Sequence, residues 1–254
     1  MAAAEKSSSL FVKQKHLVLN SVDLSRKGSI DEPIIELIKL INCNDSYFSL
    51  SSCSGRLLCV DNQIAGAVQK KGCNWLMVSH DKIQVEDLIK HSELLEGNAV
   101  FKFEPFVLHV QCKTLKHAQN LHAVAVESGF RNSGITVSNK GKIVAAVRST
   151  HSMEVPLSKH GRLLVSTEYL EFIAEIANSK MDENLVRIER FYENFKAMLN
   201  RSETASENKH SLRDERKTCK NKRQLREKSP GKECIQDIET GIENLFENDS
   251  KNFT

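Results

Sequence analysis

The amino-acid sequence predicts an α+β fold in a single domain, with a mixed, partly antiparallel sheet and flanking helices. Short apolar segments typical of strands and longer amphipathic segments typical of helices follow one another without the strict alternation of a parallel sheet. No GxGxxG fingerprint follows the first strand segment, which argues against a Rossmann-type, doubly wound domain. We expect a flexible N-terminus over residues 1–19, a folded domain over 20–200 and a disordered charged tail over 201–254.

The boundary after residue 200 rests on composition. Residues 1–200 carry 24 Lys and Arg against 22 Asp and Glu, whereas 201–232 carry 11 against 5 and 233–254 carry 1 against 6. The tail has no Trp or Tyr and few aliphatic residues, so it cannot bury enough apolar surface to offset chain entropy. Its basic part is either a solvated linker, which we favour, or an arm that binds RNA phosphates or directs the protein to the nucleus.

The first half of the domain is expected to contain a helix followed by three strands. The stretch IDEPIIELIKLIN has an apolar stripe at helical spacing, and Ser29 and Glu32 are spaced as a capping box. The segments YFSLSS and RLLCV indicate two short strands joined by a tight turn at residues 53–55. The segment NWLMVSH is the third strand candidate.

A helix and a long strand are expected next. The segment IQVEDLIKHSELLEG has a helical pattern that ends at Gly97. The following stretch, AVFKFEPFVLHVQC, alternates like a strand until Pro105 interrupts it. Because proline cannot donate to a strand ladder, this interruption suggests a bulge or an edge strand.

The rest of the domain reads as helix, hairpin, short strand and long helix. The first helix opens at Thr114 and closes with Gly129 as its C-cap. A hairpin turns at residues 139–141, and the strand candidate RLLVS follows after a loop. A long amphipathic helix is expected over residues 167–199.

Several classes of protein are disfavoured by what the sequence lacks. No secretory signal or run of about 18 apolar residues is present, so we expect no membrane association and a cytoplasmic location. The seven cysteines form no close CxxC pair with matching histidines, so we expect free thiols and no metal site. The phosphate-loop, HExxH and GxSxG signatures are also absent.

Four short polar clusters remain as candidate binding residues, because such residues concentrate on loops and strand ends. They are SSCSGR, HVQC, SGFRNSGIT and VRSTHSMEVP. The first and third combine small hydroxyls and a glycine with an arginine, which suits close backbone approach to a ligand and pairing with its carboxylate or phosphate. The alternative for SSCSGR is an ordinary serine-rich turn with an exposed arginine.

Four single residues have two interpretations each. His109 either packs in the core or points into a pocket as a base, and burial is the more common fate. Cys53 is either a buried thiol, which we favour, or a nucleophile, which requires a paired base and a lowered pKa. Trp75 either packs in the core, which we favour, or stacks on a nucleic-acid base. His151 lies among polar neighbours, so solvent exposure is the plain alternative to a functional role.

Six strings in this order carry a family resemblance: DLSRKGSID, SSCSGR, KFEPFVLHVQC, SGFRNSGITV, VRSTHSMEVPLS and MDENLVRIERFY. Together they closely resemble the tRNA wybutosine-synthesizing protein 3 family over about residues 20–197. One such string would be weak, but six in register are highly specific. The resemblance implies an S-adenosyl-L-methionine-dependent methyltransferase of a fold unlike the doubly wound methyltransferases. It implies N-methylation of the tricyclic guanosine derivative next to the anticodon of phenylalanine tRNA.

The resemblance also directs the assignment of site residues. His109 is the candidate base for the acceptor proton. Arg26, Lys27 and Arg148 are expected to contact tRNA phosphates, with exposed surface charge as the alternative. The residues expected to hold the methyl donor are Ser51, Ser52, Gly55, Arg56, Arg131, Ser133 and Gly134.

Partners and competing functions follow from the same assignment. The expected partner is the anticodon loop of phenylalanine tRNA, with other wybutosine-pathway enzymes as further candidates. A second reading is a noncatalytic RNA-binding scaffold that presents tRNA to another methyltransferase, and failure to bind the donor would support it. A third is a thiol-dependent enzyme centred on Cys53, which predicts that Cys53→Ser abolishes activity.

Overall fold

The structure is a computed structural model that describes residues 2–21, 28–62, 73–92 and 94–226, without the side chains of residues 2–8, 73 and 202–226. The chain divides into two compact units, Met1–Glu203 and Thr204–Thr254. The first unit contains the sheet and the helices that pack on it. The helices are α1 (Ala2–Leu19), the short 3-10 helix η1 (Glu32–Ile34), α2 (Ile35–Cys43), α3 (Val85–Ser92), α4 (Leu115–Glu127) and α5 (Thr167–Arg226).

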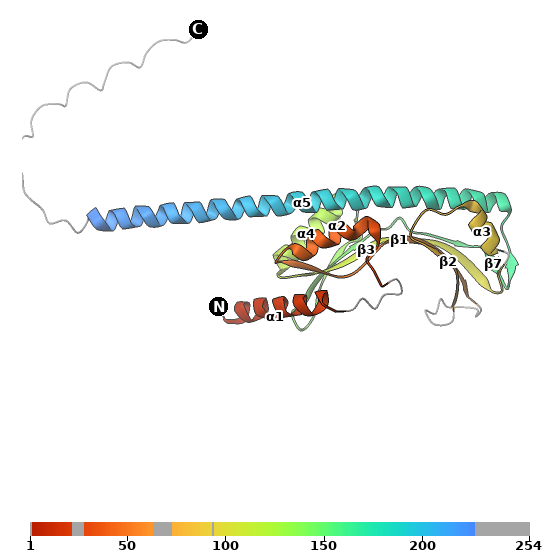
Figure 1. Ribbon diagram of the computed structural model, residues 1–254, viewed down its shortest axis with the longest axis horizontal. Helices are drawn as coiled ribbons and strands as arrows, with labels where there is room; N and C mark the ends of the chain where they lie inside the picture. The colour runs from red at the N-terminus through yellow and green to blue at the C-terminus, as the bar shows by residue number, and fades with distance from the viewer. Residues whose placement is uncertain (1, 22–27, 63–72, 93, 227–254) are drawn as a thin grey trace, which may run out of the picture. The chain divides into compact units, whose positions relative to one another are not determined.

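A six-stranded sheet forms the centre of the first unit (Figure 1). Its order is β2-β1-β3-β5-β4, β6 also pairs with β3, and every pairing is antiparallel. The strands are β1 (Tyr47–Asn62), β2 (Cys73–Ser79), β3 (Asn98–Cys112), β4 (Gly134–Val137), β5 (Ile143–Arg148) and β6 (Met153–Pro156). Two shorter strands, β7 (Ser158–Lys159) and β8 (Arg162–Leu163), form a separate ribbon. The predicted α+β fold with flanking helices is confirmed.

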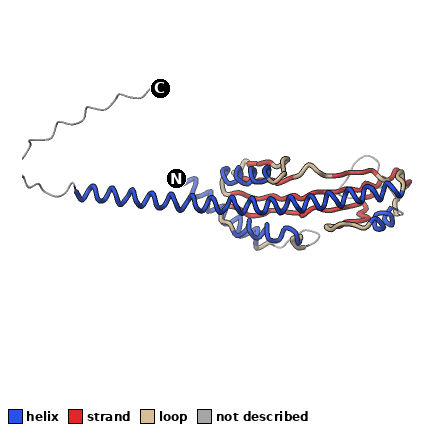
Figure 2. The backbone as a smooth tube through the Cα atoms, turned by 90° about the horizontal axis from the view of Figure 1, so that it is seen from above, coloured by secondary structure: helices blue, strands red, loops and turns tan. Residues whose placement is uncertain are grey.

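Helices cover the two faces of the sheet unequally. Helices α2, α4 and α5 lie on one face (Figure 1), and α5 runs along the strands (Figure 2). Helix α1 lies on the other face and covers only one end of it, where the Phe11 ring packs 5.1 Å from the Phe48 ring and Gln111 donates a hydrogen bond to Gln14. No described helix covers the rest of this second face, which we call the open face.

The two central strands bend at the same level. Gly55 of β1 has φ +111, a conformation that favours glycine, and it pairs with Pro105 of β3. On its other side β3 pairs with β6 through residues 100–103 and with β5 through residues 107–112. Pro105 therefore lies where β3 changes partner and no ladder hydrogen bond is required of it. The edge-strand expectation is wrong for β3 as a whole, because the strand is central.

The bend also divides the hydrophobic core into two clusters. One packs β3 residues such as Phe106 and Leu108 against α2, α4 and the later turns of α5. The other packs Phe101 and Phe103 against α3 and the first turns of α5. Inward-facing positions on β3 thus change from odd to even numbers across Pro105. The alternation of inward and outward side chains along β3 shifts by one residue at the proline, so one strand contributes to both clusters.

Three local expectations are wrong. Residues 53–55 do not form a tight turn, since β1 continues through them from Tyr47 to Asn62. The capping box fails because Asp31, not Ser29, is the N-cap residue, and its side chain makes no cap hydrogen bond to the helix. The helix expected to end at Gly97 ends at Ser92.

Helix ends governed by local chemistry were predicted correctly. Thr114 caps α4 and accepts a hydrogen bond from the His117 amide. Gly129 has φ +101, and the next amide, of Phe130, donates to the carbonyl of Ala125 at 2.8 Å. This is the hydrogen-bond pattern of a Schellman motif, which closes the helix and turns Phe130 into the core.

The ends of the chain differ from expectation in their backbone. Residues 2–19 are helical, and Phe11 is buried against the sheet, where we expected a flexible terminus. Helix α5 begins at Thr167 as predicted but continues through Arg226, into the tail that we expected to be disordered. Residues 227–254 lie outside the described part. Among the described residues, no helix is long and apolar enough to cross a membrane.

Candidate functional site

The open face of the sheet brings together several residues singled out from the sequence. Ser51 of β1 pairs with His109 of β3, His109 pairs with Ala146 of β5, and Ala146 pairs with Gly134 of β4. Paired residues lie side by side on the same face. Arg148 follows two residues after Ala146 and so shares that face. We call Ser51, His109, Gly134, Ala146 and Arg148 the central row.

Hydrogen bonds fix the His109 ring within the central row. Its Nδ1 lies 3.1 Å from Ser51 Oγ, and its Nε2 lies 3.2 Å from Nη2 of Arg148. Arginine can only donate, so Nε2 accepts and Nδ1 carries the proton of the neutral ring. Burial, and then the Arg148 charge, lower the pKa of His109. The Nε2 lone pair of His109 therefore accepts the Arg148 hydrogen bond, and the lowered pKa favours the neutral ring at physiological pH.

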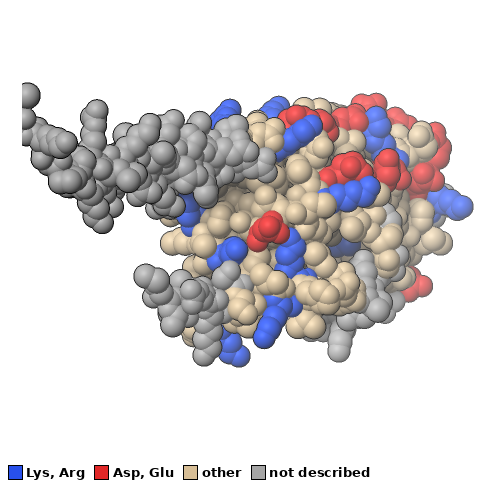
Figure 3. All heavy atoms as spheres, turned by 60° about the vertical axis from the view of Figure 1, so that its left-hand side comes forward, with Lys and Arg blue, Asp and Glu red and all other residues tan. Residues whose placement is uncertain are grey.

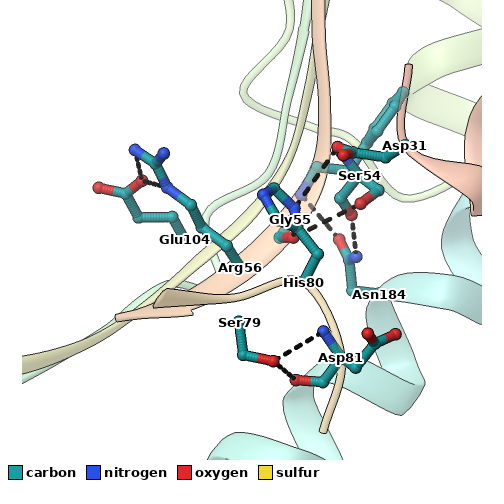
Figure 4. A network of polar contacts seen from close by, with 10 residues as sticks. Asp31, Ser54, Gly55, Arg56, Ser79, His80, Asp81, Glu104 and Asn184 are labelled. Atoms are coloured by element: carbon teal, nitrogen blue, oxygen red, sulfur yellow. Dashed lines mark hydrogen bonds and ion pairs between the residues drawn. The ribbon is translucent and has the colours of Figure 1, made fainter. Parts of the chain in front are cut away.

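A second polar group sits at the outer edge of β1, just before β2 begins to pair with it at Leu57. There Asp31 Oδ2 accepts a 2.8 Å hydrogen bond from the Ser54 amide, and His80 Nδ1 lies 3.0 Å from the Gly55 carbonyl oxygen. Asp31 Oδ2 is also 3.5 Å from His80 Nδ1. Figure 4 shows both side chains directed at the backbone of Ser54 and Gly55. The Ser54 amide and the Gly55 carbonyl, which would pair with a further strand at this edge, are instead hydrogen-bonded by an aspartate and a histidine.

The orientation of His80 follows from these contacts. A carbonyl oxygen only accepts, so His80 Nδ1 donates to Gly55, and in the neutral ring the lone pair lies on Nε2. Nε2 has no hydrogen-bond partner within the described part of the chain. The Asp31 carboxylate, 6% exposed as a residue, lies 3.5 Å from the same Nδ1 atom. A carboxylate, an oriented imidazole and a free lone pair are the arrangement of a general base.

Asn184 of α5 supports this group from the core. Its Nδ2 donates to the Ser54 carbonyl at 2.7 Å, and its Oδ1 accepts from the Phe106 amide at 2.8 Å. The side chain is fully buried and binds both strands at the bend. We call Asp31, Ser54, Gly55, His80 and Asn184 the Asp31 cluster (Figure 4).

Cys53 connects the two groups, since it follows Ser51 by two residues on β1 and lies beside the Asp31 cluster. Burial raises the pKa of its thiol, and the nearby Asp31 charge acts in the same direction. Asp31, Cys53 and His80 offer possible ligand atoms within 4.8 Å of one another. However, the carboxylate and the imidazole already bind the β1 backbone, and a thiol with a raised pKa is a poor ligand. We therefore interpret Asp31, Cys53 and His80 as a hydrogen-bonded cluster and not as a metal site.

Arg56 and Glu104 form a charged pair on the open face beyond the bend. Arg56 Nε lies 2.8 Å from Glu104 Oε2, with side chains 31% and 47% exposed. The Arg56 guanidinium also lies 5.2 Å from the centroid of the Trp75 ring. Trp75 is half-buried on β2 rather than enclosed in the core. A cation, an anion and an aromatic face are thus presented together.

The structure separates the remaining predicted residues. Ser133 joins the central row, because its Oγ accepts from the Arg148 amide at 3.1 Å. Ser52 alternates with Ser51 and belongs to the opposite side of β1. Arg131 is exposed in the turn after α4, with no side-chain contact to the central row. Arg26 and Lys27 lie outside the described residues.

The loop that follows Arg148 turns away from the open face and binds α5. His151 Nε2 lies 3.4 Å from the Lys180 carbonyl, Lys180 Nζ donates to the His151 carbonyl at 3.1 Å, and Arg187 donates to Ser149 Oγ at 3.2 Å. Burial, and then the Arg187 charge, lower the pKa of His151. This loop is a structural anchor for α5 and contributes no residue to the central row.

Sequence reasoning missed Asp31, His80, Glu104 and Asn184 as members of the site. Three of them lie in strings that carried the family resemblance, DLSRKGSID, KFEPFVLHVQC and MDENLVRIERFY. His80 ends the predicted third strand. Nothing local distinguishes these residues from capping or surface residues, because their partners are distant in the sequence.

Acidic side chains are concentrated along the outer side of α5. Figure 3 shows acidic side chains gathered along the upper part of the molecule, the level at which α5 runs in Figure 1. The exposed acids of α5 in the first unit are Glu168, Glu171, Glu175, Asp182, Glu183, Glu189 and Glu193. Arg190, Lys196 and Arg201 are exposed on the same segment. Acids therefore outnumber bases on this helix, which disfavours a nucleic acid there.

Comparison with known proteins assigns relatives to most of the chain. The family described as Methyltransferase TYW3 matches residues 12–197. A protein from Danio rerio named tRNA wybutosine-synthesizing protein 3 homolog is 54% identical over 190 residues, which cover 74% of this chain and 76% of the relative. A Pyrococcus furiosus protein named tRNA(Phe) 7-((3-amino-3-carboxypropyl)-4-demethylwyosine(37)-N(4))-methyltransferase 1 is 38% identical over 194 residues, covering 74% and 96%. The solved structure of the PH1069 protein from Pyrococcus horikoshii is similar with a TM-score of 0.68 and 33% identity, covering 75% of this chain and 96% of that chain.

Proposed function

This chain belongs to the methyltransferase TYW3 family, whose members act on tRNA wybutosine intermediates, and from that premise we propose that it N-methylates the tricyclic base next to the anticodon of phenylalanine tRNA. The name of the Pyrococcus furiosus relative specifies position 37 and atom N4 of a 7-(3-amino-3-carboxypropyl)-4-demethylwyosine. We propose the same acceptor for this chain. S-adenosylmethionine supplies the methyl group when it is bound.

The observation that carries the proposal is the His80 imidazole, which donates to the Gly55 carbonyl and lies 3.5 Å from the Asp31 carboxylate. An acceptor nitrogen that bears a hydrogen must lose it when the nitrogen gains a methyl group, so a proton acceptor is required. His80 Nε2 is free to take that proton, and the Asp31 carboxylate stabilises the imidazolium that results. Asn184 keeps the β1 bend in the shape that presents both groups.

His109, the base expected from the sequence, suits a binding role better. Its Nε2 lone pair accepts from Arg148, and burial with the Arg148 charge lowers its pKa. Both effects weaken it as a proton acceptor. We propose that His109 orients Arg148 and that His80 serves as the base.

The donor fits the charged pair beside the bend. S-adenosylmethionine ends in an α-amino acid, which carries an ammonium and a carboxylate. Arg56 and Glu104 present the complementary charges within 2.8 Å of each other, and both remain partly exposed. Gly55 allows close approach of the backbone beside them. The proposed donor residues are thus Ser51, Gly55 and Arg56, with Ser133 and Gly134 at the other end of the central row.

The tRNA is proposed to lie over the open face. A base within a hairpin loop reaches an active site by splaying out of the stack. The open face carries Arg148 and the half-buried Trp75, whose ring can stack on a base. The acidic outer side of α5 disfavours the opposite approach (Figure 3).

The test is transfer of a labelled methyl group from S-adenosylmethionine to phenylalanine tRNA that carries the unmethylated precursor. We expect His80→Gln to lower the single-turnover rate by about 100-fold or more, as for loss of a general base, while donor and tRNA still bind. His91→Gln is the matched control, because the one side-chain hydrogen bond that His91 of α3 makes among the described residues is to the Asp87 carbonyl of its own helix. Arg56→Ala should instead weaken donor binding. Tight tRNA binding by folded wild-type protein without transfer would favour the scaffold.

A further inference from the structure

Arg148 is an exposed residue of β5 on the open face, with no acidic partner among the described residues. Its guanidinium contacts His109 Nε2 at 3.2 Å, and its backbone amide donates to Ser133 Oγ at 3.1 Å. The other described arginines that hold fixed side-chain positions pair with carboxylates, Arg56 with Glu104 and Arg187 with Glu183. Arg148 is therefore positioned by a neutral ring, and its charge is left for a ligand.

The geometry of this guanidinium suits a carboxylate. Arginine has five N–H donors in a planar fork, and contact with His109 uses one side of that fork. The remaining donors can bind two oxygens of one planar group in parallel. His109 is itself held by Ser51 Oγ at 3.1 Å, so the fork has a fixed direction before ligand arrives.

Two α-amino-acid groups meet in the proposed reaction, and Arg56 and Arg148 are the two arginines of the open face that can receive them. The donor carries one such group, and the acceptor named for the Pyrococcus furiosus relative carries the other as its 3-amino-3-carboxypropyl chain. Arg56 on β1 has Glu104 beside it and matches a complete zwitterion. Arg148 on β5 has no carboxylate beside it and matches a carboxylate alone.

A phosphate of the tRNA backbone is the weaker ligand for Arg148. Its side chain lies against the sheet in contact with His109, in the same row as Ser51 and Ser133. A splayed base is the part of a nucleotide that reaches the floor of a site, whereas the backbone stays at the rim. Lysines such as Lys140 and Lys142, exposed on the β4–β5 turn, are better placed for the rim.

We propose that Arg148, oriented by His109, binds the carboxylate of the aminocarboxypropyl chain on the acceptor base and so makes the enzyme select this intermediate. The inference rests on the proposed function and adds to it the residue that sets acceptor specificity. Arg148 then contributes to binding in ground state and transition state alike. Its loss should raise KM for the natural acceptor with little change in kcat.

The experiment compares two acceptor tRNAs, one with the aminocarboxypropyl chain on the tricyclic base and one with the same base lacking it. For wild type we expect preference for the first, in kcat/KM and in tRNA affinity measured without donor. Arg148→Gln should reduce that preference by about 10-fold or more, as for a lost charge-assisted hydrogen bond, and should leave the poorer acceptor unaffected. Arg148→Lys, which keeps the charge but not the fork, should recover only part of it. Lys142→Gln is the control for general phosphate binding.

Several results would overturn the assignment. Weaker binding of S-adenosylmethionine by Arg148→Gln would place the donor carboxylate at this arginine. Equal weakening of both tRNAs, with a smaller dependence on salt, would make Arg148 a phosphate contact. Equal affinity of the wild type for both tRNAs would also show that Arg148 does not bind the aminocarboxypropyl chain. Because affinity is measured without donor, an inactive wild type would count against the proposed function while the binding comparison still decides the role of Arg148.

Discussion

The side-chain amide of Asn184 occupies the space into which a β-carbon on Gly55 would project. Such a carbon would lie 2.9 Å from Asn184 Nδ2 and 3.3 Å from the Glu104 carbonyl oxygen. Gly55 also has φ +111, which side chains rarely adopt. The glycine in SSCSGR is therefore required by a buried asparagine on a distant helix as well as by its own backbone.

Gly55→Ala should destabilise the protein by about 1–3 kcal/mol, the range for strained backbone, because the alanine methyl must displace Asn184 or the β3 backbone. Urea unfolding followed by circular dichroism measures the change. Gly134→Ala is the control, since nothing lies within 4 Å of the added carbon and no positive φ is required there. It should shift the free energy of unfolding by about 0.5 kcal/mol or less. Equal losses in the two variants would contradict the steric account.

Asn184→Ala should be costly because it leaves two backbone groups unpaired at the bend, the Ser54 carbonyl and the Phe106 amide. Each buried group without a partner costs about 1–3 kcal/mol. Asn178→Ala is the matched control on the same helix. Asn178 makes the same pair of bonds, to the Ile83 amide and carbonyl, but is half-buried.

Water can replace the lost bonds at Asn178 and cannot do so at Asn184, so the free energy of unfolding should fall further for Asn184→Ala. If the two variants unfold at the same urea concentration, Asn184 does not hold the bend. Comparison of methyl transfer at a temperature where both variants are folded then separates a shift in the site from a loss of stability.

Acid should destabilise the anchor formed by the loop around His151. Burial, and then the Arg187 charge, lower the pKa of His151 in the folded protein below the value near 6.5 of an unfolded chain. As pH falls through that value, the unfolded state binds a proton that the folded state resists, so stability is lost. Above it both states are neutral, and the contribution is constant.

His151→Gln should therefore flatten the part of the pH dependence of unfolding that lies below about pH 6.5, the reference value for histidine. Urea midpoints measured between neutral and mildly acidic pH test this. His109 and His117, whose pKa values are also lowered, chiefly by burial, continue to contribute. If the free energy of unfolding of His151→Gln falls with pH as steeply as that of the wild type, protonation of His151 does not destabilise the loop.

How far the sequence could predict the structure depends on how local the deciding contacts are. Thr114 and Gly129 were placed correctly because each helix end is closed by groups within a few residues. The turn at residues 53–55 was wrong because a bend within one long strand and a hairpin share the same glycine-containing sequence. What decides between them is Asn184, 130 positions from Ser54.

The same distinction explains the site. Ser51, His109 and Arg148 were candidates because polar residues on strands are conspicuous, and the sheet register brings them together. Asp31 was interpreted as part of a helix start, since an acid before an amphipathic run is typical of one. Its carboxylate instead binds the open edge of β1, an edge that exists only because β2 pairs no further than Leu57. Pairing limits of this kind have no local signature.

Cys53 is expected to be dispensable for the reaction. Burial, reinforced by the Asp31 charge, raises the pKa of its thiol, so little thiolate is present at neutral pH. Methyl transfer that depends on positioning and on a base at His80 does not require a sulfur nucleophile. Cys53→Ala should keep its single-turnover rate far above the roughly 100-fold loss that marks removal of an essential proton-transfer group.

Two further measurements complete the test of the thiol. Wild-type enzyme should resist iodoacetamide at neutral pH at Cys53, while Cys43, exposed at the end of α2, reacts. Cys43→Ser removes the exposed thiol of α2, and peptide mapping by mass spectrometry distinguishes alkylation of Cys53 from that of the other cysteines. Rapid inactivation of that variant, together with an inactive but folded Cys53→Ala, would establish thiol catalysis and remove His80 from the central role. Slow alkylation with retained transfer leaves the thiol as a packed neighbour of the Asp31 cluster.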